Sequence, residues 1–260
     1  MLKMQAPNLS RTLSPYERNQ LRKYAIPEAV ALEMPHMPIE YLTGFADFCG
    51  HSFEVTTDSL IPRVETEELV QLALLWLEKN HNHLQGSPTV LDVGTGCGAI
   101  ILSLALTNQH PAKYIASDIS KKALNIALRN AKKFKLDSIT WAESNLLDFL
   151  DENQPIDVII ANLPYIPTAR IAYLDSSVKD FEPILALDGG PDGLTYIRKL
   201  LTQAKSHLAP NGEILLEIDY THRNDLIQEF SQIYQVETWQ SPISSCTFAR
   251  CTLLPGSNIS

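Results

Sequence analysis

The stretch TVLDVGTGCGAI, residues 89–100, decides the fold of this chain. Residues 90–93 are apolar apart from Asp92, which predicts a buried strand, and residues 99–106 continue as an apolar helix. Between them stand the three glycines Gly94, Gly96 and Gly98. Glycine lets the backbone turn tightly and approach a ligand, and the free N–H groups at a helix start bind carboxylate or phosphate groups. The stretch therefore predicts a ligand-binding turn between a first strand and a first helix.

Outward from this turn, the chain alternates between strand and helix patterns. Strands are predicted over 90–93, 114–117, 139–142, 156–161 and 213–218, helices over 99–106, 121–134 and 194–207, and two closing strands over 234–239 and 247–254. Such alternation is typical of a parallel, doubly wound sheet. We therefore expect a Rossmann-like α/β fold, with a mostly parallel seven-stranded sheet and an antiparallel C-terminal edge.

The N-terminal third has a different pattern. Ser14 and Pro15 read as the cap and first turn of a helix, and a later helical period covers 65–79. Phenylalanines and glycines between these helices predict a short β-hairpin. The predicted organisation is a short helical arm over 1–40, a β-hairpin with a connecting helix over 41–86, and the α/β domain over 87–260.

Composition narrows the class of protein. Of the 260 residues, 45% are hydrophobic and 20% charged, as in ordinary globular proteins. The net charge of −9 and the lack of a basic block argue against stable nucleic-acid binding. The four cysteines are scattered without a CxxC pair, so neither a disulfide framework nor a cysteine metal site is expected. With no signal-peptide pattern and no membrane-length apolar run, we expect a cytoplasmic protein without membrane contact.

The acid that follows the glycine turn indicates the ligand. Asp118 lies twenty residues beyond Gly98 at the end of the next predicted strand, where a carboxylate can accept hydrogen bonds from ribose hydroxyls. The spacing DxGxGxG, with Asp92 at its entrance and Thr95 and Cys97 within it, differs from the pyrophosphate motif GxGxxG. No phosphate needs to be held, so the pattern favours S-adenosyl-L-methionine over NAD or ATP.

A second motif, Asn162-Leu163-Pro164-Tyr165, follows the apolar strand 156–161. Ligands of such folds bind beyond the carboxyl ends of the strands. The Asn162 side-chain oxygen and the Leu163 carbonyl can accept the two N–H bonds of a planar amide or amine, and Tyr165 can stack on the flat group. This arrangement predicts methyl transfer to nitrogen, with Asn162 and Tyr165 catalytic. The alternative is a strand-ending turn with a surface tyrosine.

These motifs together resemble the release-factor glutamine N5-methyltransferase (HemK/PrmC) family. The resemblance covers residues 38–254, and the matching stretches are PIEYLTG, LIPRVETEELV, VLDVGTGCGAI, ASDIS, IIANLPYIP, FEPILALDGGPDGL and GEILLEI. It implies a class I methyltransferase fold, with the methyltransferase domain over 87–260. It also implies that the substrate is the glutamine of the Gly-Gly-Gln loop in peptide-chain release factors.

The resemblance also implies the site residues. Those implied to hold S-adenosyl-L-methionine are Asp92, Gly94, Thr95, Gly96, Cys97, Gly98, Asp118, Asn145, Leu146 and Asn162, and those implied to hold glutamine are Asn162, Leu163, Pro164 and Tyr165. The chain departs from the family in three ways. Leu163 replaces a proline, Asn145-Leu146 replaces an acid and an aromatic residue, and the N-terminal helical domain shrinks to about forty residues.

Other candidate residues carry weaker patterns. In IPRVETE, Arg63 and Glu65 either order the hairpin against the site or cap the helix over 66–77, and a structural or gating role is predicted. The loop residues Glu182-Pro183 and Asp188-Gly189-Gly190 either shape a substrate channel or serve as a structural loop. His81-Asn82-His83 has no third ligand nearby in the sequence, so no metal site is expected.

Three alternative functions remain at this level. An adenine-N6 methyltransferase of DNA or RNA uses the same turn but needs a basic surface and a flipped base. A ribosomal-protein glutamine methyltransferase differs only in its protein substrate. A non-catalytic module would keep the fold as a scaffold.

Overall fold

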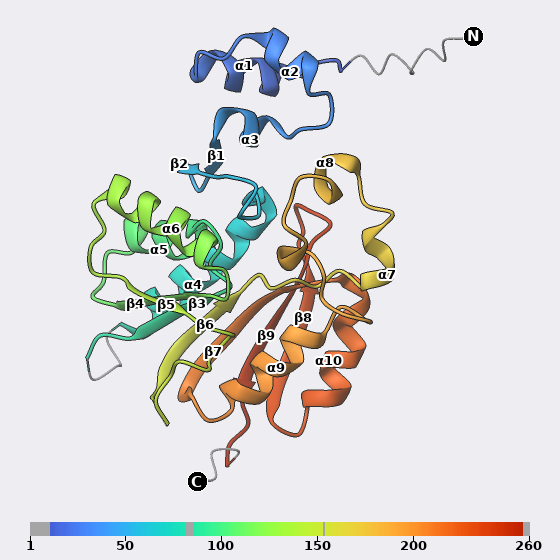
Figure 1. Ribbon diagram of the computed structural model, residues 1–260. Coiled ribbons are helices and arrows are strands. Elements are labelled where there is room, and N and C mark those ends of the chain that lie inside the picture. Colours follow the sequence, from blue (N-terminus) through green and yellow to red (C-terminus); the bar gives the residue numbers. More distant parts are fainter. Residues whose placement is uncertain (1–10, 82–85, 153, 257–260) are drawn as a thin grey trace.

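The computed structural model describes residues 11–81, 86–152 and 154–256 (Figure 1). The helices are α1 (Pro15–Lys23), α2 (Glu28–Glu33), α3 (Ile39–Thr43), α4 (Glu67–Asn80), α5 (Ala99–Thr107), α6 (Lys121–Phe134), α7 (Thr168–Ile171), α8 (Ser176–Lys179), α9 (Thr195–Ala204) and α10 (Arg223–Phe230), with 3-10 turns η1 (Val64–Thr66), η2 (Ile184–Ala186) and η3 (Tyr220–His222). The strands are β1 (Phe45–Phe48), β2 (His51–Glu54), β3 (Thr89–Val93), β4 (Lys113–Asp118), β5 (Thr140–Glu143), β6 (Ile156–Ala161), β7 (Leu208–Ile218), β8 (Tyr234–Gln240) and β9 (Thr247–Leu253).

The central sheet has seven strands in the order β5-β4-β3-β6-β7-β9-β8. The five strands β5, β4, β3, β6 and β7 run parallel to one another. Strand β9 runs antiparallel to both β7 and β8. The predicted sheet with its antiparallel C-terminal edge is confirmed. The strand order reverses at β3, where the chain passes from β5 back across to β6, so the carboxyl ends of β4, β3 and β6 lie side by side.

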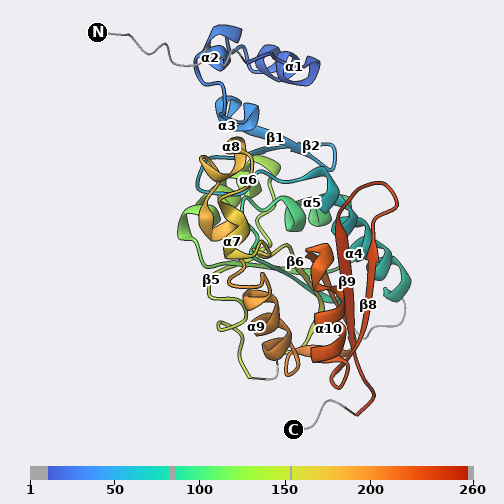
Figure 2. The same cartoon turned by 90° about the vertical axis from the view of Figure 1, so that its right-hand side faces the viewer.

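Helices cover both faces of this sheet (Figures 1 and 2). Val90 and Val158 pack in one apolar cluster with α4, α5 and α6, while the next residues along, Leu91 and Ile159, pack in a second cluster with α9 and α10. Successive residues of a strand point to opposite faces, so a strand covered on both sides must be apolar throughout. This explains the almost continuous apolar run over 156–161.

The N-terminal arm packs on its own small core at one end of the molecule (Figure 1). Ser14 caps the N-terminus of α1 in a capping box, and Pro15 occupies the first turn, as predicted. The hairpin β1–β2 joins this arm to the sheet domain. The side chain of the fully buried Asn130 accepts a hydrogen bond from the Glu54 N–H and donates to the Cys97 carbonyl, so the hairpin is tied to the glycine loop.

Element boundaries differ from the predictions where tertiary contacts decide them. The helix predicted over 65–79 begins as η1 and becomes α-helical only at Glu67, because Thr66 is held by contacts outside the helix. The short helices α7 and α8 and the helix α10 were not predicted, since their few residues show no clear helical period. In the described part of the chain, no helix has the length and apolar character that a membrane span requires.

Candidate active site

One cavity of about 1080 Å³ lies at the carboxyl ends of β3, β4 and β6. Ten of the predicted site residues line it: Gly94, Thr95, Gly96, Cys97, Asp118, Asn145, Leu146, Asn162, Leu163 and Pro164. The glycine loop and the Asn-Leu-Pro turn, 68 residues apart in the chain at Gly94 and Asn162, therefore share one cavity.

The glycine loop is shaped by its contacts with the neighbouring strand and turn. The N–H groups of Gly94 and Thr95 both donate to the Ser117 carbonyl, at 2.8 and 3.0 Å. Gly94 has φ +73°, and a Cβ atom there would lie 3.0 Å from the Leu163 side chain. Glycine is thus required at position 94 for its backbone conformation and for the close approach of the Asn-Leu-Pro turn.

Asp92 lies behind the cavity and is absent from its lining. It is fully buried, and one of its carboxylate oxygens accepts a hydrogen bond from Thr95 Oγ1 at 2.6 Å. Its other oxygen, Oδ1, has no protein partner. Burial raises the pKa of Asp92 to about 7. Asp92 therefore acts on the cavity through Thr95. Gly98 also lies outside the lining, as the N-cap of α5.

Asp118 has the geometry that a ribose-binding carboxylate requires. Its two oxygens accept hydrogen bonds from the N–H groups of Gly96 and Ser120, both at 2.8 Å, which fixes the side chain at the end of β4. Each carboxylate oxygen has further lone pairs for a ligand hydroxyl. Burial raises the pKa of Asp118.

The cavity also contains a polar atom without a protein partner. Ser144 Oγ is buried, makes no hydrogen bond to the described residues, and belongs to the lining between Asp118 and Asn145. Beside it, Leu146 has φ +57°, a strained conformation for a leucine. An unpaired buried hydroxyl next to a carboxylate and an amide fits a polar ligand such as an adenosyl group. Sequence reasoning missed Ser144, since one serine carries no pattern.

The Asn-Leu-Pro-Tyr turn divides between the cavity and the sheet. Asn162, Leu163 and Pro164 line the cavity, but Tyr165 does not. The Tyr165 hydroxyl instead donates a hydrogen bond at 3.0 Å to Oε1 of Glu217, a carboxylate in β7. The predicted stacking of Tyr165 on a substrate remains a prediction.

Two residues that sequence reasoning missed contact this turn. Asn162 Nδ2 donates to Thr66 Oγ1 at 3.0 Å, and Thr66 Oγ1 donates to Glu217 Oε2 at 2.6 Å. Glu217 is 2% exposed, and burial raises its pKa. The available signal was a single charged residue inside the apolar run 214–218, where an acid is rarely found without a partner.

Arg63 and Glu182 form an ion pair across the mouth of the cavity. Both carboxylate oxygens of Glu182 accept from Arg63 Nη2, at 2.6 and 2.7 Å. Arg63 lines the cavity, and both residues line a second, larger cleft, which we call the outer cleft. Glu65 lines the outer cleft only, whereas Pro183 lines the cavity. Burial raises the pKa of Glu182, and the Arg63 charge opposes this shift.

The segment Asp188-Gly189-Gly190 supports the Asn-Leu-Pro-Tyr turn from behind. The Gly189 N–H donates to the Ile166 carbonyl at 2.8 Å, and a Cβ atom at Gly189 would lie 2.7 Å from the Pro164 carbonyl oxygen. Asp188 accepts hydrogen bonds from Thr168 and from the Gly190 N–H. The segment is outside the lining of the cavity, so the structure favours the structural-loop interpretation.

The outer cleft measures about 1650 Å³ and lies between the N-terminal arm, the hairpin and α8. Its charged lining residues are Glu17, Glu40, Asp47, Glu65, Asp175 and Glu182, against Arg11 and Arg63. Glu17, Asp47 and Glu182 pair with Arg11, Lys23 and Arg63, so the excess negative charge of this lining rests on Glu40, Glu65 and Asp175. Such a surface attracts basic segments and repels phosphate.

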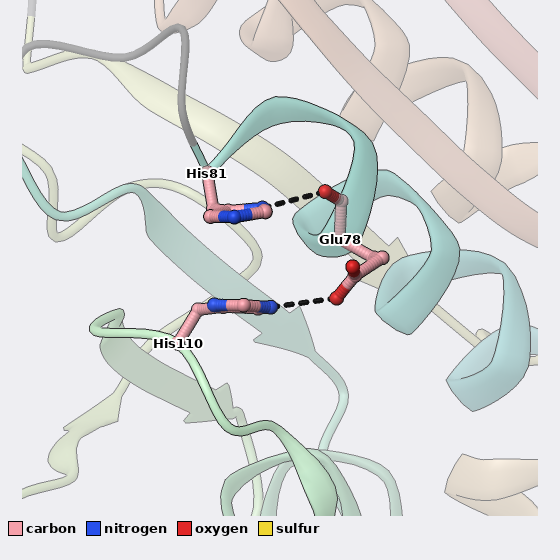
Figure 3. A group of neighbouring side chains, drawn as sticks. All are labelled: Glu78, His81 and His110. Carbon is pink, nitrogen blue, oxygen red and sulfur yellow. Dashed lines mark hydrogen bonds and ion pairs between the residues drawn. The ribbon is translucent and has the colours of Figure 1, made fainter.

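A cluster of Glu78, His81 and His110 lies at the other edge of the sheet (Figure 3). The two imidazole rings stack with centroids 3.8 Å apart, and His110 Nε2 contacts Glu78 Oε2 at 2.6 Å. Their potential ligand atoms lie within 4.8 Å of one another. The sequence showed no third group near His81 because His110 comes from the loop before β4; Asn82 and His83 lie outside the described residues.

Comparisons with known proteins agree with this site. A family model described as a methyltransferase domain matches residues 85–249. The release factor glutamine methyltransferase of Geobacter sulfurreducens is 35% identical over 203 residues, covering 78% of this chain and 68% of the relative. That of Clostridium acetobutylicum is 35% identical over 236 residues, covering 90% and 79%. The chain belongs to the release factor glutamine methyltransferase family.

The predicted family resemblance is thereby confirmed. Among other relatives in this family, the release factor glutamine methyltransferase of Moorella thermoacetica is 43% identical over 182 residues, covering 70% of this chain and 62% of the relative. This chain thus spans less than two thirds of that relative's length. All three relatives are named release factor glutamine methyltransferase.

Solved structures with low sequence identity to this release factor glutamine methyltransferase family member show its fold. A ribosomal protein L11 methylase from Lactobacillus delbrueckii subsp. bulgaricus has 21% identity and a TM-score of 0.51, covering 74% of this chain and 80% of that chain. A methyltransferase from Pyrococcus furiosus has 18% identity and a TM-score of 0.54, covering 92% and 98%. The class I methyltransferase fold is confirmed.

Proposed function

We propose that this protein uses S-adenosyl-L-methionine to methylate the N5 nitrogen of the glutamine in the Gly-Gly-Gln loop of a peptide-chain release factor. One observation carries the proposal: the glycine loop with Asp118 and the turn with Asn162 line the same cavity. A methyl donor and a carboxamide bound at these two places would meet inside it. The family membership supports the identity of the carboxamide.

Residues of the cavity suit the cofactor. Asp118 would accept hydrogen bonds from the ribose hydroxyls, and Ser144 and Asn145 would face the adenosyl group. The exposed apolar side chain of Ile119 lines the cavity next to Asp118 and offers a surface for a flat base. When bound, the sulfonium group of the cofactor supplies an electrophilic methyl group.

Residues of the turn suit a carboxamide. The amide nitrogen is a weak nucleophile because its lone pair is delocalised. Asn162 Oδ1 and the Leu163 carbonyl would accept its two N–H bonds and so hold the nitrogen in line with the methyl group, at the reacting distance of about 3–3.5 Å. After methyl transfer the amide proton would leave to water or to Asn162, so no general base is required in the transfer step.

The outer cleft favours a protein substrate over a nucleic acid. An adenine-N6 methyltransferase would present phosphate-binding cations along the approach to its cavity. Here six carboxylates line that approach against two arginines. A basic or neutral loop of a protein suits this surface better than a polyanion.

Mass spectrometry tests the proposal directly. Release factor incubated with the protein and the cofactor should gain one methyl group on the loop glutamine. Asn162→Ala should lower the rate by about a hundredfold or more, since an orienting acceptor is lost, while cofactor affinity stays near that of the native protein. The same assay with a ribosomal protein or an adenine-containing oligonucleotide covers the alternatives. Methylation of either of these in place of the release factor, or native turnover by Asn162→Ala, contradicts the proposal.

A further inference from the structure

A continuous chain of hydrogen bonds connects the buried carboxylate of Glu217 to Asn162. Thr66 Oγ1 lies between them, 2.6 Å from Glu217 Oε2 and 3.0 Å from Asn162 Nδ2. Glu217 comes from β7, Thr66 from η1 and Asn162 from the loop after β6. Glu217 and Asn162 lie 151 and 96 positions from Thr66 along the chain. Thr66 is 3% exposed and Glu217 is 2% exposed, which leaves water little access to these bonds.

The chemistry of these groups fixes the direction of each hydrogen bond. Thr66 donates its single hydroxyl proton to Glu217 Oε2, and the Tyr165 hydroxyl donates to the other oxygen, Oε1. The Thr66 oxygen is then left as an acceptor, and the group of Asn162 that faces it must be the NH2. Because the two ends of an amide are opposite, Asn162 Oδ1 points away from Thr66. The Glu217 carboxyl group, which accepts the Thr66 proton, therefore determines which end of the Asn162 amide is free.

Burying the Glu217 carboxyl group in β7 costs desolvation free energy. Glu217 makes no ion pair among the described residues, and its carboxylate is stabilised by two neutral hydroxyl donors, Thr66 and Tyr165. An apolar residue of similar size in β7 would avoid the desolvation of a carboxylate. The two donors both belong to segments of the active site, which associates the buried charge with the position of these segments.

We propose that Thr66 and Glu217 are positioning residues that orient the Asn162 side chain so that its oxygen faces the substrate nitrogen. The inference rests on the proposed function, in which Asn162 Oδ1 accepts a hydrogen bond from the substrate amide. A flipped Asn162 would present an NH2 donor to an NH2 donor, and the substrate nitrogen would lose its orientation. Thr66 lies in the IPRVETE segment, and this bond gives that segment a direct connection with catalysis.

Kinetics of Thr66 variants test the proposal. Thr66→Val keeps the shape but removes the hydroxyl, so kcat should fall by about a hundredfold while the Kd of the cofactor and the KM of the release factor change little. Thr66→Ser restores the hydroxyl and should recover most of the rate. Thr221→Val is the matched control, because it removes a hydroxyl that donates to Asp219 at 2.7 Å outside the cavity. It should keep native kcat.

Glu217→Gln tests the charge itself. A glutamine side chain both donates and accepts, so the Thr66 hydroxyl can point either way, and kcat should fall by roughly tenfold with the fold preserved. Native kcat in both Thr66→Val and Glu217→Gln overturns the proposal. So does equal loss in Thr66→Val and Thr66→Ser, since the hydroxyl would then be irrelevant.

A measurement without turnover separates this inference from the proposed function. In protein labelled with ¹⁵N-asparagine, the Asn162 side-chain NH2 signal is identified by its absence from Asn162→Asp. Its hydrogen exchange with water should accelerate by roughly tenfold in Thr66→Val and stay unchanged in Thr221→Val. If the native protein fails to methylate release factor but this pattern holds, only the substrate assignment fails. An unchanged exchange rate in Thr66→Val overturns the hydrogen-bond chain.

Discussion

At the scale of single residues, the site depends on backbone positions that allow little substitution. Gly94 combines a positive φ of +73° with a neighbour, the Leu163 side chain, that a Cβ would contact at 3.0 Å. The loop and the turn are thus packed against each other at one atom position. A side chain at position 94 must displace the end of the Leu163 side chain, which belongs to the turn that is proposed to bind the substrate.

Gly94→Ala tests this packing, and Gly50→Ala is its matched control. Gly50 has nearly the same φ, +74°, with nothing within 4 Å of its Cβ position. Both variants should lose about 1 kcal/mol of unfolding free energy from backbone strain, measured by urea denaturation. Gly94→Ala should lose additional stability and most of its methyl transfer. Equal stability losses and equal activities in the two variants would show that the contact with Leu163 is unimportant.

At the scale of elements, the cavity is closed by segments distant in sequence. Arg63, just before η1, is joined to Glu182, between α8 and η2, by an ion pair in which the glutamate side chain is 1% exposed and the arginine side chain 35%. The pair separates the cavity from the outer cleft. It therefore links the segment that carries Thr66 to the segment that covers the mouth of the cavity.

A double-mutant cycle measures this link. Arg63→Gln and Glu182→Gln should each destabilise the protein, Arg63→Gln more strongly because it leaves a buried carboxylate unpaired. The double variant should be more stable than the sum of the single effects predicts, with a coupling energy of about 1 kcal/mol, given the partial exposure of Arg63. Additive effects in urea unfolding would mean that the two segments are held together by other contacts.

At the scale of the whole molecule, the negative charge is the feature proposed to favour a protein partner over a nucleic acid. The net charge is −9, and the outer cleft concentrates carboxylates between the N-terminal arm and the sheet domain. The arm, although short, forms one wall of this cleft and has a small core of its own. The lining of the outer cleft thus has an excess of negative charge, while the cavity itself is lined in part by the glycine loop and the turn.

Salt dependence tests the electrostatic role of the outer cleft. Raising the ionic strength from 0.01 to 0.15 M shortens the Debye length from about 30 to about 8 Å. The KM for release factor should therefore rise several-fold, while kcat stays constant. The variant Glu40→Gln with Glu65→Gln should show a weaker dependence. A KM that is insensitive to salt, or that falls with salt, excludes charge attraction as the basis of recognition.

Much of the fold was predictable from local patterns. The apolar run 156–161, the glycine turn and the period of 121–134 each predicted their elements because burial on two faces or on one stripe requires such patterns. The short helices α7 and α8 were missed, since four-residue helices depend on neighbours rather than on period. Asp92 and Tyr165 were predicted to touch ligands; neither lines the cavity, and their contact with a ligand stays a prediction.

The sequence by itself determined the succession of strands and helices that forms the sheet and the two motifs that line the cavity, because these follow from residues close together in the chain. Only the tertiary structure decided which groups support the motifs. Thr66, Glu182 and Glu217 lie in segments far from the groups that they contact. Hydrogen bonds of this kind depend on distances in space. A pattern of neighbouring residues in the sequence does not contain these distances. The orientation of Asn162 is therefore a property of the folded chain.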